Sequence, residues 1–145
     1  MSLAPARPGR GFAVVLTAAT VALTLTTAYI HLSLGGLLFT LNALGYAALA
    51  VAVAVGAIPH PFISMFSWLP RVGLAGFTAV TIVAYLVIGP YFSLGWIAKA
   101  VEIGILILLA VDVMRVYGSP AGLVRAAMST LRELRAAGPM RSPTS

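Results

Sequence analysis

Apolar residues occupy the chain in long uninterrupted runs, and their pattern predicts helices. Between residues 11 and 58 the sequence contains no Lys, Arg, Asp or Glu. A membrane crossing takes about 20 apolar residues, so this run is long enough for two crossings. Gly35 and Gly36 divide the run, and glycine permits the positive φ angles of a tight reversal. The pattern therefore predicts two helices, at about 12–31 and 37–57.

A proline-rich segment, 59–71, separates this run from two further apolar stretches. It carries three prolines and three large aromatic residues. Prolines interrupt helices, and such aromatic side chains favour a membrane interface, so a loop along the membrane surface is predicted. Two more helices are expected beyond it, at about 72–88 and 96–116, joined by a short turn.

Short connections between the four predicted helices favour antiparallel neighbours. We therefore expect an all-α integral membrane protein in which residues 1–118 form an antiparallel four-transmembrane-helix bundle. The first apolar run continues beyond the ~7–15 apolar residues of a signal peptide, so the first helix is expected to remain in the mature protein.

Composition supports a membrane protein and excludes several chemistries. Hydrophobic residues make up 61% of the chain and charged residues 8%, whereas a soluble domain carries about 25% charged residues. Cysteine is absent from the sequence. Disulfides, thiolate metal sites and a cysteine nucleophile are therefore excluded.

Positive charge is distributed unevenly about the predicted helices. The side that holds both termini collects eight arginines: Arg7, Arg10, Arg71, Arg115, Arg125, Arg132, Arg135 and Arg141. The other side holds only Lys99. Because positively charged flanks remain in the cytoplasm, both termini are predicted to be cytoplasmic. The preference for Arg over Lys indicates a bacterial source, and hence a bacterial plasma membrane.

The C-terminal segment, 119–145, has the signals of a separate amphipathic helix. Ser119 is a suitable cap, Pro120 suits a first helical position, and Gly138 and Pro139 provide a stop. One face carries Leu123, Ala127, Leu131 and Leu134, and the basic residues are Arg125, Arg132 and Arg135. We predict an interfacial helix on the cytoplasmic leaflet. A solvated extension that only enforces topology is the alternative, and no nucleic-acid partner is expected.

Threonines recur on one face of the first predicted helix. The series Thr17, Thr20, Thr24, Thr27 and His31 advances by three or four residues at each step. Such hydroxyl residues allow close helix packing and bond to carbonyls four residues earlier. We interpret the four threonines as a packing face, with a polar lining that leads to His31 as the alternative.

Charged and polar side chains also gather near the predicted outer end of the bundle. These residues are His31, Asn42, Tyr85, Lys99 and Glu102. Lys99 and Glu102 are three residues apart on one helix face, which permits a local ion pair. Ionisable groups inside a membrane are costly and often functional, so a structural pair and a ligand- or proton-handling site both remain open. Asp112 and Arg115 repeat the spacing and predict an interfacial pair.

Function is less constrained than fold. The sequence contains no HExxH, GxSxG or phosphate-loop motif, so enzymatic activity is not indicated, and no metal or cofactor is expected. The first hypothesis is a non-enzymatic helix-bundle subunit that binds lipid, further copies of itself or partners in a larger membrane complex. The second is a small transporter or channel component that handles a proton or cation. The third is a quinone-binding oxidoreductase subunit.

Overall fold

The computed structural model describes residues 9–136, and all regular structure in that range is α-helical. The helices are α1 (Arg10–Leu34), α2 (Leu37–Gly56), α3 (Pro61–Met65), α4 (Trp68–Ile88), α5 (Ser93–Tyr117) and α6 (Pro120–Ala136). By length and composition, α1, α2 and α4 are long and apolar enough to cross a membrane. Helix α5 is as long as α1 but carries four charged residues, and it is not among these three.

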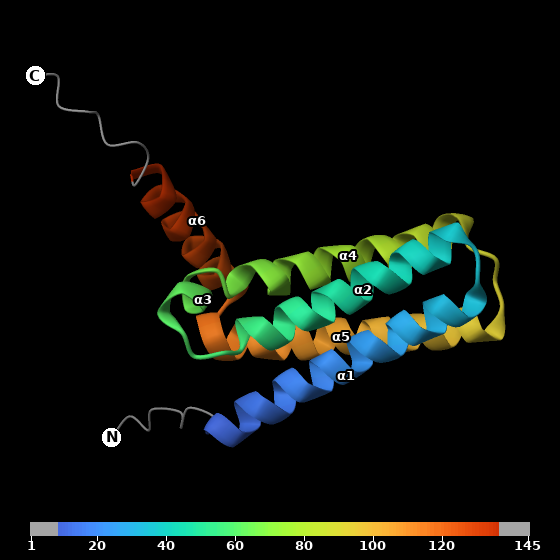
Figure 1. Cartoon of the computed structure of the whole chain (residues 1–145), viewed down its shortest axis with the longest axis horizontal. Coiled ribbons are helices and arrows are strands. Elements are labelled where there is room, and N and C mark those ends of the chain that lie inside the picture. Colours follow the sequence, from blue (N-terminus) through green and yellow to red (C-terminus); the bar gives the residue numbers. More distant parts are fainter. Residues whose placement is uncertain (1–8, 137–145) are drawn as a thin grey trace, which may run out of the picture.

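The four long helices lie side by side, and each runs opposite to the one before it (Figure 1). Helix α1 packs against α2 and α5, and α4 packs against the same two helices. Helices α1 and α4 therefore face each other across the middle and run in the same direction. We call the end with the α1–α2 and α4–α5 connections the hairpin end, and the opposite end the α3 end.

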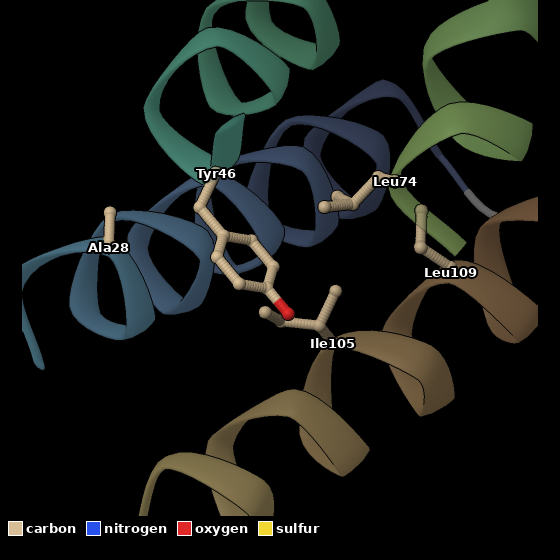
Figure 2. Close-up of a cluster of buried hydrophobic side chains, with 5 residues drawn as sticks. All are labelled: Ala28, Tyr46, Leu74, Ile105 and Leu109. Atoms are coloured by element: carbon tan, nitrogen blue, oxygen red, sulfur yellow. The ribbon is translucent and has the colours of Figure 1, made fainter. Parts of the chain in front are cut away.

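The apolar core contains residues from all four long helices. Figure 2 shows its buried members, Ala28, Tyr46, Leu74, Ile105 and Leu109. Close approach of α2 and α4 depends on a glycine, because a Cβ at Gly45 would lie 2.5 Å from Cζ of Phe77. The outward helix faces remain apolar and exposed, as at Val14, Leu44, Val51, Val80 and Val83.

The predicted reversal between the first two helices is present. Gly35 and Gly36 have φ angles of 70° and 83°, in the region that favours glycine. Helix α1 continues to Leu34, so His31 lies in its last turn instead of at its end.

The 59–71 segment was predicted as a loop but is partly helical. It contains α3, and α4 already begins at Trp68, so Pro70 and Arg71 lie in the first turn of α4. Proline is tolerated there because the first N–H groups of a helix have no intrahelical partner. The earlier start places Arg71 on the buried face of α4 rather than in a surface loop.

Helix α6 begins as predicted, with the Gly122 N–H donating to Ser119 Oγ at 3.0 Å. Its contact with the rest of the chain includes Thr130, whose hydroxyl donates to the Met65 carbonyl at 3.1 Å. The basic residues Arg125, Arg132 and Arg135 are exposed, as are Leu131 and Leu134, whereas Leu123 and Ala127 are half-buried. Arg7, Arg141 and the predicted stop at Gly138 and Pro139 lie outside the described residues.

Candidate functional site

Glu102 is fully buried and is the hub of a polar cluster. Lys99 Nζ lies 2.5 Å from its Oε2, and His31 Nε2 lies 3.6 Å from its Oε1. Thr27 donates to Oε1 at 3.4 Å, and Thr81 Oγ1 lies 3.2 Å from Oε2 but has a closer acceptor for its single proton, the Thr78 carbonyl at 2.8 Å. Each carboxylate oxygen thus has a threonine hydroxyl and a basic group beside it.

All four long helices contribute to this cluster. Helix α1 supplies Thr27 and His31 one turn apart, α4 supplies Thr81, and α5 supplies the Lys99–Glu102 pair. From α2, the Tyr46 hydroxyl lies 2.6 Å from Thr81 Oγ1, and its ring lies 5.5 Å from the His31 ring. We call this group the Glu102 centre: Thr27, His31, Tyr46, Thr81, Lys99 and Glu102.

The hydrogen bond of His31 Nδ1 determines what its other ring nitrogen offers to Glu102. Nδ1 lies 2.8 Å from the Thr27 carbonyl oxygen, and a carbonyl only accepts, so Nδ1 carries a proton. In neutral His31, Nε2 is then an acceptor that faces another acceptor, the Glu102 carboxylate. A proton on either Nε2 or Oε1 turns this contact into an attraction. The gap between these two atoms is therefore a position for a proton.

Aromatic side chains lie between the Glu102 centre and the hairpin end. The Tyr85 ring lies 5.4 Å from Lys99 Nζ, and its hydroxyl donates to the Phe92 carbonyl at 3.3 Å. A Cβ at Gly95 would lie 2.5 Å from the Tyr85 hydroxyl oxygen, so the absence of a side chain there makes room for Tyr85. Only 4% of His31 and 5% of Lys99 is exposed. The centre is therefore nearly closed at this end.

A second charged group lies near the α3 end, around Asp112. Arg71 Nε donates to Oδ2 at 2.7 Å, and Arg115 Nη2 donates to Oδ1 at 2.6 Å. The Arg71 guanidinium also lies 5.9 Å from the centroid of the Tyr117 ring. We call Arg71, Asp112 and Arg115 the Asp112 centre, in which two cations share one carboxylate.

The structure brings together three of the five residues of the predicted outer cluster, His31, Lys99 and Glu102. Tyr85 joins them through its ring. Asn42 is half-buried and has no hydrogen bond to the centre within residues 9–136. The predicted cluster did not include Tyr46 and Thr81. Each nevertheless lies one helical turn from another polar residue on its own helix, Tyr46 from Asn42 and Thr81 from Tyr85.

The predicted threonine face of α1 is turned inward. Thr20 and Thr24 are buried and donate to the carbonyls of Leu16 and Thr20, four residues earlier. Thr17 is half-buried. Thr27, at the end of the series, instead directs its hydroxyl to Glu102, so this face serves both packing and the Glu102 centre.

Metal binding gains no support from the described part of the chain, where no three His, Asp or Glu side chains are grouped to hold an ion. Comparison with known protein families, curated proteins and solved structures gives no match for this chain. Function is therefore inferred from the geometry of the two charged centres.

Proposed function

We propose that the chain is a multi-pass protein of the plasma membrane, with four spans in an antiparallel bundle and both termini in the cytoplasm. The exposed apolar helix faces and the arginines near the α3 end support this arrangement. Helix α5 is included as a span because its charges are paired, Lys99 with Glu102 and Asp112 with two arginines. In this topology the hairpin end faces outward and α6 lies at the cytoplasmic surface.

Within this bundle, we propose that the Glu102 centre takes up and releases a proton, as part of a small proton transporter or channel. The supporting observation is the contact between His31 Nε2 and Glu102 Oε1, 3.6 Å apart, with Nδ1 already donating elsewhere. A purely structural ion pair needs only Lys99 and Glu102. His31 adds a third ionisable group in a place where such groups are costly and usually functional.

The charge of the centre makes proton exchange chemically reasonable. The Lys99–Glu102 pair is neutral, so addition of one proton takes the centre from zero to one positive charge. Glu102 and Tyr46 are the titratable groups in contact with His31. Lys99 lies on the other oxygen of Glu102, and Tyr85 lies beside Lys99. The Thr27 hydroxyl donates to the carboxylate, and Thr81 Oγ1 lies 3.2 Å from its other oxygen, so both side chains help to position it when the proton leaves.

Proton flux into liposomes that contain a pH-sensitive dye tests this proposal. The parent protein is expected to carry protons, and His31→Gln and Glu102→Gln are each expected to reduce the flux at least about tenfold. His60→Gln is the matched control, because His60 is exposed near the α3 end. The accompanying measurement is the infrared difference spectrum between about pH 8 and about pH 5, which reports carboxyl and imidazole protonation. Absence of flux in the parent would refute the transporter, and absence of a protonation signal that His31→Gln removes would refute proton binding by the Glu102 centre.

A helix-bundle subunit that binds a lipid or a partner protein is the second candidate. It is supported by an open apolar groove of about 530 Å³ between α2, α3 and α4, lined in part by Leu49, Val55, Phe62, Phe66 and Leu69. Purification in mild detergent, with mass spectrometry of what co-elutes, tests it. A stoichiometric lipid or protein that is lost in Phe62→Ser would favour this candidate, and a co-eluting quinone would favour the oxidoreductase hypothesis.

A further inference from the structure

A small, largely enclosed cavity lies beside the Asp112 centre. Its volume is about 10 Å³, and its lining includes Thr17, Thr20, Val53, Arg71 and Asp112. This is about the space that one water molecule needs, and such a water requires two to four polar partners. Two threonines, a guanidinium and a carboxylate meet that requirement. The cavity is therefore suited to a single buried water.

Helix register connects this cavity to the Glu102 centre. Helices α1 and α4 run in the same direction, and at one level the hydroxyls of Thr27 and Thr81 lie beside the two oxygens of Glu102. About one turn toward the α3 end the same two helices carry Thr24 and Thr78, both fully buried. Further steps reach Thr20 and then Thr17 at the cavity. We call this hydroxyl-lined route the seam. Its residues are Thr17, Thr20, Thr24 and Thr78.

An unsatisfied hydroxyl lies within this seam. Thr78 is fully buried, and its Oγ1 has no hydrogen-bond partner within the described part of the chain. Buried polar atoms are normally paired, with ordered water where no protein group is available. The hydroxyls of Thr20 and Thr24 donate to carbonyls but keep lone pairs that accept from a water. The Tyr46 hydroxyl also lies near the Thr78 side chain, and a water beside these two groups would complete their hydrogen bonding.

We propose that water occupies the cavity and the space beside Thr78, and that this hydrated seam carries protons between the Glu102 centre and the α3 end. This inference rests on the proton exchange proposed above. A proton leaves His31 Nε2 or Glu102 Oε1 at one end, each water or hydroxyl in the seam accepts one proton and releases another, and bulk water at the α3 end accepts the last one, so one proton is moved in net. Asp112 stays ion-paired and orients the cavity water. Threonine side chains one turn apart are about 5–6 Å apart, a gap that one water bridges with two hydrogen bonds.

Three substitutions distinguish a seam that conducts protons from threonines that only pack helices together. Thr20→Val removes a hydroxyl that lines the cavity, and Val53→Ile fills the cavity while it keeps every hydroxyl. Thr78→Val removes the unpaired hydroxyl, which by itself should not weaken the fold. The matched control is Thr26→Val, because the Thr26 hydroxyl makes the same bond to a carbonyl four residues earlier at 2.9 Å but is exposed.

The experiment measures two quantities for each variant in liposomes: proton flux, and the infrared protonation signal of the Glu102 centre. The three seam variants are expected to lose flux at least about tenfold and to keep the protonation signal, and Thr26→Val is expected to retain both. Unchanged flux in the seam variants, or a parent with the protonation signal but no flux, overturns the seam and leaves proton binding intact. Absence of the protonation signal in the parent overturns proton binding itself.

Discussion

Replacement of Lys99 by Met should destabilise the protein strongly, because it leaves a fully buried carboxylate without its nearest cation. Lys99 is 5% exposed and Glu102 is 0% exposed, so solvent screens neither charge. Loss of one partner of a buried ion pair costs about 3–5 kcal/mol. We therefore expect Lys99→Met to lower the free energy of unfolding by an amount in that range.

The opposite single substitution should cost less. In Glu102→Gln the side-chain amide still bonds to the two threonine hydroxyls, and Lys99 keeps the Thr81 carbonyl at 3.4 Å and the Tyr85 ring. Lys99 also has a long stem that can turn toward the hairpin end. A loss of about 1–3 kcal/mol is expected, as for a single buried hydrogen-bonding group. The double variant removes both charges and should be more stable than Lys99→Met alone.

Unfolding in mixed micelles, followed by far-ultraviolet circular dichroism, measures all four proteins of this double-mutant cycle. Lys99→Arg, which retains the cation, is the control. A cost below about 1 kcal/mol for Lys99→Met, as found for exposed ion pairs, would refute the argument. Strict additivity of the two single changes would refute it as well, because it would mean that Lys99 and Glu102 do not interact energetically.

Two further predictions concern the Asp112 centre and the glycines of the helix contacts. Arg71→Met and Arg115→Met should each lower the free energy of unfolding by about 1.5–3 kcal/mol. The double variant should lower it by more than their sum, because Asp112 is then left without either cation. Thermal unfolding of a double variant that is no less stable than either single variant would contradict this. Gly45→Ala should destabilise by about 1–3 kcal/mol, since its Cβ meets a phenyl ring at 2.5 Å. Gly76→Ala, with open space around it, should gain about 0.5–1 kcal/mol, and chemical denaturation that ranks these two variants in reverse would exclude this account.

The helical fold was accessible from the sequence because its signals are local. Apolar runs and the Gly35–Gly36 pair act within a few residues, and the helices fall where those runs lie. The beginning of α4 was missed because Pro70 indicates an interruption in a sequence but is harmless in a first helical turn. The distinction depends on where the helix starts, which the proline itself does not determine.

The charged centres were predicted only in part, because periodicity fixes the face of a helix but not its rotation or depth against a neighbour. Lys99 and Glu102 were paired correctly, since both lie on one helix. The pairing of Arg71 with Asp112 joins α4 to α5 and could not be read from spacing. The same limit explains why Tyr46 lies in the Glu102 centre and Asn42 does not, although both belong to α2.

The two centres differ in where their partners come from, and this difference has a consequence for biosynthesis. The Lys99–Glu102 pair is complete within one helix, so in the proposed membrane topology α5 would enter the bilayer with these two charges already neutralised, before it meets any other helix. Asp112 has Arg115 within its own helix, but its second partner, Arg71, belongs to a helix made earlier. The α3 end would therefore reach its final arrangement only when α5 docks beside α4, and a ribosome that pauses before this point would leave Arg71 without its carboxylate partner.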